Sequence, residues 1–163
     1  MKPKVYIETS VISYLVAWRS PQLIMAANQE ATRQWWDEQR HEFDLFVSAA
    51  VRDEAARGNA DAVQKRMEVL DSLEELAVTE HAADIADQIL RETLVPHKAA
   101  VDAMHIAIAA VNQMDYLLTW NCRHIANATL RRPLSQLLSA NGLTTPIICT
   151  PAELIELEGD SND

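Results

Sequence analysis

Three carboxylates and one amide stand at positions where they could bind a metal ion together. Asp102 lies between Ala99 and Val111, where it and His105 are the only ionisable side chains in an otherwise apolar helical pattern. A carboxylate in apolar surroundings is costly unless it is paired, hydrogen-bonded or bound to a metal. The sequence therefore predicts that Asp102 has partners elsewhere in the chain.

Glu8, Glu54 and Asn121 are the candidate partners. Glu8 and Asn121 each follow an apolar strand pattern, and Glu54 lies in the helix expected after a further strand. The carboxyl ends of parallel strands form the usual ligand edge of an α/β sheet, so these side chains could converge there with Asp102. Converging carboxylates repel unless a cation neutralises them. Mg²⁺ or Mn²⁺ would do so, and could activate water for attack on a phosphodiester.

Each of these residues also has an ordinary structural explanation. Glu8 could be an acid stabilised by a helix dipole, Glu54 a solvated acid in a surface salt bridge, and Asn121 a helix cap. His105 lies one turn from Asp102 and could pair with it. Because such a histidine is more often a satisfied core residue, His105 is not counted among the metal ligands.

The distribution of charge adds a second candidate feature. A formal net charge of −10 excludes a surface that binds nucleic acid over its whole area. Residues 116–152 nevertheless contain no Asp or Glu, and this segment carries Arg123, Arg131 and Arg132. These arginines could position RNA phosphates beside the carboxylates. The alternative is a surface segment whose arginines pair with acids elsewhere.

The elements that must position these residues alternate along the chain. Apolar runs predict short strands at 5–7, 45–47, 76–78 (an edge strand), 116–118 and 147–149. Helical patterns are expected between them, capped by Thr9 or Ser10, Ser48 and Thr79, with one helix over about 21–42, one over about 60–74 and a terminal one opening at Pro151. Predicted core positions of two helices are Leu23, Ile24, Ala27, Ala31 and Trp35, and Ala83, Ile85 and Ile89. This alternation indicates an α/β fold with a central parallel sheet covered on both faces.

Composition is typical of one ordinary globular domain. The chain has 163 residues, 48% hydrophobic and 23% charged, which favours a single domain over 1–157 followed by a polar tail over 158–163. Cys122 and Cys149 fit no metal-finger spacing and are expected to be reduced thiols. Glu8 interrupts the N-terminal apolar run, so the first residues are not expected to form a signal peptide. No apolar stretch is long enough to span a membrane. We therefore expect a cytoplasmic protein.

Four motifs, in this order and spacing, resemble the PIN-domain family, and within it the VapC-like toxins of bacterial type II toxin–antitoxin systems. They are Val5–Ile12 with its acidic-Thr-Ser step, Phe46–Glu54, Asp102–Ala107, and Leu117–Asn121 followed by His124–Asn127. The third is the most specific single match. The resemblance extends over nearly the whole chain. Glu at the first acidic position and the Trp-Asn-x-x-His-Ile-Ala-Asn signature are similar to one subgroup.

The resemblance implies a three-layer α/β/α sandwich and Mg²⁺- or Mn²⁺-dependent endoribonuclease activity on RNA. It also implies a cognate antitoxin protein and frequent homodimerisation. Carried over by motif, the implied metal ligands are Glu8, Glu54 and Asp102, the fourth catalytic position is Asn121, and the supporting hydroxyls are Thr9 and Thr119.

Two positions depart from the family pattern. The first acid is usually Asp rather than Glu8, and the fourth position is usually acidic rather than Asn121. Asn121 keeps an oxygen ligand but loses a negative charge, so a second metal ion would be held more weakly. The main alternative is therefore a catalytically weak or inactive PIN-fold binding protein. A different metal-dependent phosphohydrolase is a third reading, which the missing paired-Asp motif after the first strand disfavours.

Overall fold

A five-stranded parallel sheet forms the centre of the protein, in the strand order β3-β2-β1-β4-β5. The structure is a computed structural model that describes residues 1–92 and 94–155. The strands are β1 (Lys4–Ile7), β2 (Asp44–Ser48), β3 (Glu74–Leu76), β4 (Tyr116–Leu118) and β5 (Ile147–Cys149). The predicted parallel sheet is confirmed, with β3 at one edge.

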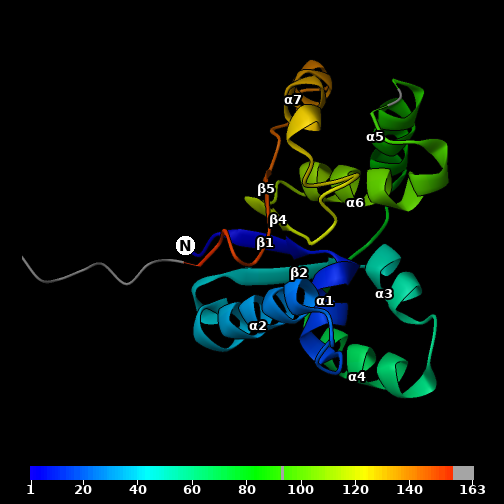
Figure 1. Cartoon of the computed structure of the whole chain (residues 1–163). Helices are drawn as coiled ribbons and strands as arrows, with labels where there is room; N and C mark the ends of the chain where they lie inside the picture. Colours follow the sequence, from blue (N-terminus) through cyan, green and yellow to red (C-terminus); the bar gives the residue numbers. More distant parts are fainter. Residues whose placement is uncertain (93, 156–163) are drawn as a thin grey trace, which may run out of the picture.

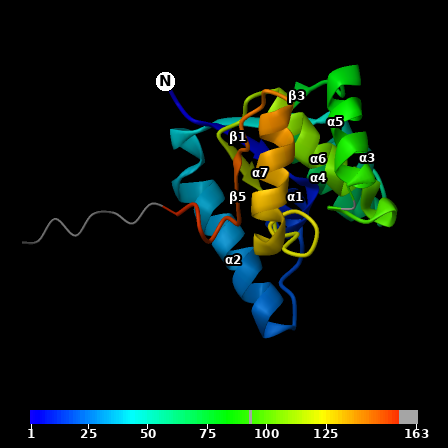
Figure 2. The same cartoon turned by 90° about the horizontal axis from the view of Figure 1, so that it is seen from above.

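Helices cover both faces of this sheet, which confirms the three-layer α/β/α architecture. Figure 1 shows α1, α2 and α4 on one side and α5, α6 and α7 on the other, and α6 lies between α7 and α5 also when seen from above (Figure 2). The helices are α1 (Thr9–Val16), α2 (Leu23–Glu38), α3 (Ala49–Ala55), α4 (Ala60–Leu70), α5 (Glu80–Arg91), α6 (Ala100–Val111) and α7 (Arg131–Ala140). Short 3₁₀ turns are η1 (Arg40–Glu42), η2 (His97–Ala99) and η3 (Ala128–Leu130).

The central strand β1 defines the place where a site can form. It pairs with β2 on one side and with β4 on the other, so that Tyr6 lies opposite both Phe46 and Leu117. From β1 the chain adds β2 and β3 toward one edge and then returns to add β4 and β5 toward the other. The order therefore reverses between β1 and β4, and the carboxyl ends of strands at such a reversal are where α/β proteins bind ligands.

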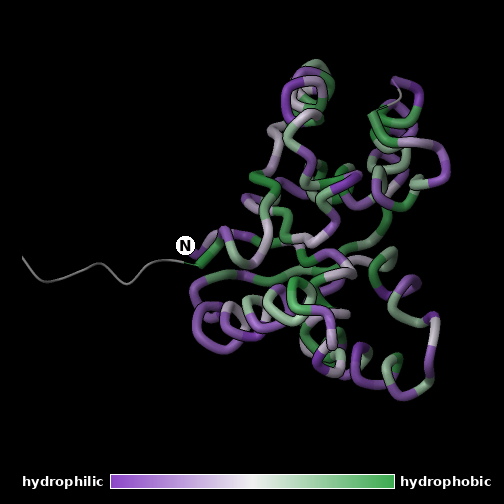
Figure 3. Tube along the Cα trace, in the orientation of Figure 1, coloured by the Kyte–Doolittle hydropathy of each residue, from purple (hydrophilic) through white to green (hydrophobic). Residues whose placement is uncertain are grey.

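The apolar core runs along the strands and α6. The tube coloured by hydropathy is apolar there and more polar on the outward turns of the other helices (Figure 3). In α6, Ala103 and every residue from His105 to Ala110 are buried, which confirms a helix that is apolar almost all round. This helix forms the platform that carries Asp102 and His105 to the sheet edge.

Helix caps agree with the sequence at two positions and differ at one. The hydroxyls of Ser48 and Thr79 accept the backbone N–H of Val51 and Ala82, as predicted. At α1, however, the cap is Glu8 rather than Thr9 or Ser10, because the Glu8 carboxylate itself accepts the Ser10 N–H. The helix consequently starts directly after β1, and a predicted metal ligand holds its first turn.

The predicted core face of α2 is correct at Trp35, which is fully buried, and wrong at Leu23 and Ile24, which are 85% and 79% exposed. Gln29 and Thr32, which were not predicted, are buried instead. The burial of the two polar residues is possible because both are hydrogen-bonded: Gln29 bonds to the backbone of residues 18 and 20, and Thr32 accepts the Trp120 indole N–H. Hydrophobicity alone therefore indicated only part of the buried face of α2.

Smaller differences concern boundaries and alanines. The helices predicted to end near 42 and 74 end at Glu38 and Leu70, and β3 begins at Glu74, two residues earlier than predicted. In α5, Ile85 and Ile89 are buried as predicted, but Ala83 is exposed. Residues 151–154 form turns instead of opening a helix. The polar tail over 158–163 lies outside the described residues. Among the residues described, no helix is both long and apolar enough to cross a bilayer.

The two thiols are expected to differ sharply in reactivity. Cys122 is exposed and Cys149 is buried, and burial, with the nearby charge of Glu153, raises the pKa of Cys149 to about 12. At pH 8 only about one in 10⁴ Cys149 side chains is then a thiolate, the form that reacts. Iodoacetamide followed by mass spectrometry should modify Cys122 in the native protein and Cys149 only after unfolding. Equal labelling of both under native conditions would contradict the burial of Cys149 at the end of β5.

Candidate metal centre at the carboxyl edge of the sheet

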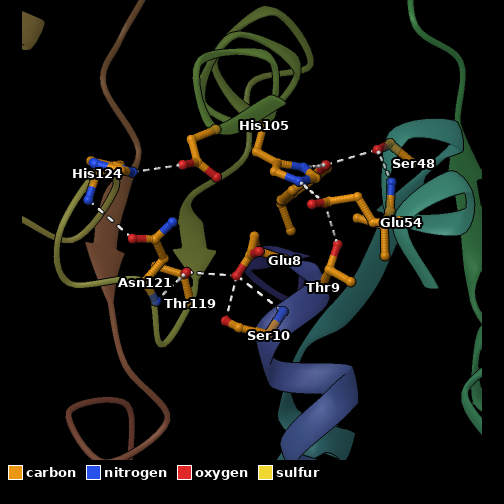
Figure 4. Close-up of polar contacts among 12 residues, drawn as sticks. Glu8, Thr9, Ser10, Ser48, Glu54, His105, Thr119, Asn121 and His124 are labelled. Carbon is orange, nitrogen blue, oxygen red and sulfur yellow. Dashed lines mark hydrogen bonds and ion pairs between the residues drawn. The ribbon is translucent and has the colours of Figure 1, made fainter. Parts of the chain in front are cut away.

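The chemistry-bearing side chains meet at the edge where β1 and β4 end. Glu8 follows β1, Thr119 follows β4, Glu54 comes from α3 and His105 from α6 (Figure 4). One oxygen or nitrogen atom from each of Glu8, Glu54 and His105 lies within 4.8 Å of the others. The structure thus brings two of the predicted metal ligands together with a histidine that the sequence analysis set aside.

Glu8 is a buried carboxylate, 4% exposed, and one of its oxygens is firmly held. Oε2 accepts hydrogen bonds from the Ser10 backbone N–H at 3.1 Å, from the Thr119 hydroxyl at 2.7 Å and from the Ser10 hydroxyl. Within residues 1–92 and 94–155, Oε1 has no hydrogen-bond donor. The side chain is therefore fixed in orientation while one oxygen stays free to bind a cation.

Glu54 is positioned by α1 and α6. Its Oε1 accepts from the Thr9 hydroxyl at 2.7 Å and lies 2.5 Å from Nε2 of His105. Burial acts to raise the pKa of this carboxyl, but the hydrogen bond and charge of His105, together with Thr9 and Arg57, outweigh it and hold the pKa below its usual value. Glu54 is consequently an anion at neutral pH.

A buried chain of hydrogen bonds runs behind Glu54. His105 is fully buried, and its Nδ1 lies 2.7 Å from the Tyr6 hydroxyl, which lies 2.8 Å from Oγ of Ser48. Burial, followed by the charges of Glu8 and Glu54, raises the pKa of Tyr6 well above its usual range, so its hydroxyl stays protonated. His105 is thus a satisfied core residue, as predicted, but the suggested pairing with Asp102 is wrong because Glu54 and Tyr6 occupy both ring nitrogens.

Asp102 and Asn121 form a second group beside the first. Asp102 is partly buried, and its Oδ2 accepts from Nδ1 of His124 at 3.1 Å. The side-chain amide oxygen of Asn121 accepts the His124 backbone N–H at 3.0 Å, while the Asn121 backbone N–H donates to the Thr119 hydroxyl oxygen. Asn121 therefore shapes the turn after β4, although no helix starts at this turn, and Asp102 stands outside the 4.8 Å group.

The two predicted supporting hydroxyls contact the carboxylates of the site. The Thr9 hydroxyl donates a hydrogen bond to Glu54, and the Thr119 hydroxyl donates one to Glu8. Arg123 lies in the loop after Asn121, and Arg131 and Arg132 open α7; all three are exposed. No acid in the described ranges forms an ion pair with them, so the suggestion that they pair with acids elsewhere finds no support there.

Tyr6→Phe is expected to destabilise the protein by about 1–3 kcal/mol, because it leaves Nδ1 of His105 buried without a partner and removes one of the two partners of Ser48 Oγ. Urea unfolding followed by circular dichroism measures the change. Tyr14→Phe is the matched control: Tyr14 is only partly buried and stacks on Trp120, so losing its hydroxyl should cost less than about 0.5 kcal/mol. Equal effects of the two changes would show that the buried chain contributes nothing to stability.

The donor set fits a divalent cation. Two carboxylates and an imidazole supply oxygen and nitrogen ligands of the kind that Mn²⁺ and similar ions accept. In addition, a positive ion would relieve the repulsion between the buried carboxylate of Glu8 and the partly buried carboxylate of Glu54. What the arrangement can do chemically is therefore metal-assisted activation of water next to an anionic substrate.

Comparisons with known proteins agree with this fold. No curated protein sequence matches the chain. VapC20 of Mycobacterium tuberculosis, described as a sarcin-ricin loop cleaving toxin, superposes with a TM-score of 0.55 at 18% identity, over 77% of this chain and 95% of that one. VapBC2 from Rickettsia felis, solved bound to a promoter DNA fragment, gives 0.50 at 11% identity, over 90% and 97%. The PIN-domain family model matches residues 5–128, and this chain therefore belongs to the PIN-domain family.

Proposed function

We propose that this protein is a metal-dependent endoribonuclease and the toxin of a toxin–antitoxin pair. The observation that carries the proposal is the pair of carboxylates, Glu8 and Glu54, held at the strand-order reversal of a PIN fold. The likeness to VapC20, whose description names cleavage of the sarcin-ricin loop, supports RNA as the substrate. We further propose that the chain belongs to the VapC-like subgroup that has Glu at the first acidic position, here Glu8, and the Trp-Asn signature, here Trp120-Asn121.

In this function each residue has a definite task. Glu8, Glu54 and Asp102 hold Mg²⁺ or Mn²⁺, with Asn121 fixing the adjacent turn. When bound, the ion supplies an activated water and neutralises charge that develops on the phosphate. Thr9 and Thr119 keep the carboxylates in place, so little reorganisation is needed during the reaction.

The exposed arginines provide the complementary positive charge. Arg123 lies two residues after Asn121 in the chain, and Arg131 and Arg132 lie at the start of α7. Arginine binds phosphate through paired N–H donors. We assign these three side chains to RNA positioning, and expect weaker RNA binding at higher salt because phosphate contacts release counterions.

An antitoxin protein is the proposed regulatory partner. VapBC2, which shares the fold, was solved bound to a DNA fragment from its promoter. We propose an antitoxin partner that covers the acidic site of this chain, a homodimeric toxin, and a cytoplasmic location where the RNA substrate is found.

A non-catalytic PIN-fold binding protein is the second candidate. It is favoured by Asn121, whose amide oxygen is already engaged by the His124 backbone and which carries no charge. Such a protein would bind RNA or protein partners without cleaving RNA.

Cleavage assays separate the two candidates. Purified protein is incubated with structured ribosomal RNA fragments and a total-RNA pool in Mn²⁺, Mg²⁺ or EDTA. The nuclease proposal predicts discrete products with metal, none in EDTA, and a large loss in Asp102→Asn. Equal cleavage by wild type and Asp102→Asn would remove Asp102 from the site. Absence of cleavage together with absence of metal binding by calorimetry would favour the binding protein.

A further inference from the structure

We propose that Nε2 of His105 is a direct ligand of the same cation, beside Glu8 and Glu54, and that it makes the site prefer Mn²⁺ to Mg²⁺. This inference rests on the proposed function and adds to its metal site a nitrogen ligand.

The first support is the direction of the imidazole. Nε2 of His105 lies 2.5 Å from Oε1 of Glu54, and both atoms belong to the group that includes a Glu8 oxygen. In Figure 4 the ring points from α6 toward Glu54, with Glu8 on the neighbouring strand end. A cation bound by the two carboxylates would therefore lie within reach of Nε2, which would bind it in the deprotonated form in place of its present contact with Glu54.

The second support is the partner of the other ring nitrogen. A metal-bound histidine almost always donates its remaining N–H to a fixed acceptor, which sets the tautomer and the ring orientation. Here the Tyr6 hydroxyl oxygen lies 2.7 Å from Nδ1 and can accept its N–H, while the Tyr6 O–H donates a hydrogen bond to Oγ of Ser48 at 2.8 Å. Ser48 in turn accepts the Val51 N–H, which ends the chain on the backbone. The neutral imidazole with hydrogen on Nδ1 is therefore fully satisfied while Nε2 binds the ion.

The third support is the position of Asp102. Its Oδ2 is engaged by His124, and it lies outside the 4.8 Å group. The nearest set of three donors is consequently two carboxylates and one imidazole. Mg²⁺ favours oxygen ligands, whereas imidazole nitrogen suits first-row transition-metal ions. Mn²⁺ is such an ion and also accepts carboxylates, so an added imidazole should favour it over Mg²⁺. A site with this imidazole should therefore prefer Mn²⁺ to Mg²⁺ more strongly than a site built only of carboxylates.

Pulsed electron paramagnetic resonance of the Mn²⁺-loaded protein tests this directly, because a ¹⁴N nucleus bound to Mn²⁺ modulates the electron spin echo. We expect nitrogen modulation in the wild type, in His124→Gln and in the exposed control His81→Gln. His105→Gln should lose the modulation, and calorimetry should show a lower Mn²⁺-to-Mg²⁺ affinity ratio than in the wild type. If His105→Gln does not fold, nitrogen modulation in His124→Gln still tests whether His105 binds Mn²⁺. Apart from His105, the histidines left in that variant are His41, His81 and His97, and all three are exposed.

Each contrary result has a distinct meaning. Bound Mn²⁺ without nitrogen modulation in the wild type, or modulation that persists in folded His105→Gln, overturns the role of His105 and leaves a carboxylate site intact. Absence of Mn²⁺ binding to the wild type overturns both this inference and the proposed metal site. Nitrogen-coordinated Mn²⁺ without RNA cleavage would retain His105 as a ligand and refute the nuclease function alone.

Discussion

Replacing Glu54 with glutamine is expected to slow RNA cleavage by about 10²-fold or more while leaving the fold intact. The amide matches the carboxylate in size and can still accept from Thr9 and His105 through its oxygen. It carries no charge, however, and so binds a divalent cation weakly and cannot help to neutralise it. Single-turnover cleavage with Mn²⁺ measures the effect.

The neighbouring acid supplies a matched control for this prediction. Asp53 is exposed on the same helix, so Asp53→Asn makes the same charge change one residue away without touching the site. Its cleavage rate should stay within about twofold of the wild type, because exposed charges contribute little to a buried centre. Glu8→Gln should behave like Glu54→Gln. If Glu54→Gln and Asp53→Asn have equal rates, Glu54 has no part in catalysis.

The largest loss of stability is expected from Ile106→Ala, at about 2–5 kcal/mol. Ile106 is fully buried in α6, in the helix that carries both Asp102 and His105. Removing three carbon atoms there loses apolar burial and leaves a cavity between α6 and its neighbours. The urea midpoint should fall with little change in slope, as for a two-state loss of stability.

Val101→Ala on the same helix is the comparison for Ile106→Ala. Val101 is 40% exposed, so its truncation should change the free energy of unfolding by less than about 0.5 kcal/mol. A loss below about 1 kcal/mol for Ile106→Ala would mean that α6 is not packed as the structure shows.

The sequence was informative wherever local chemistry determines structure. Strands β4 and β5 were predicted with their observed bounds, because a run of three apolar residues is too short for a helix and fits a buried strand. The caps at Ser48 and Thr79 were predicted because a hydroxyl that accepts a free N–H acts within three residues. Alternation of these elements predicted the parallel sheet.

Local rules failed where burial depends on distant partners. Gln29 and Thr32 were not predicted in the core, because the groups that satisfy them come from other segments, as with the Trp120 indole. Leu23 and Ile24 were predicted there and are exposed, since hydrophobicity does not state which face meets the sheet. Alanine, as at Ala83, carries too little apolar surface to indicate a face.

The sequence by itself determined the PIN fold and the residue types at the strand ends, since periodicity and motif order are properties of the chain. Only the tertiary structure decided which polar side chains contact each other at the site. His105 lies one turn from Asp102 yet contacts Glu54, 51 positions away, and Asp102 contacts His124, 22 positions away. The physical reason is that strand order and helix packing bring α3 and the turn after β4 to opposite sides of α6, and hydrogen bonds form with the nearest polar atom in space.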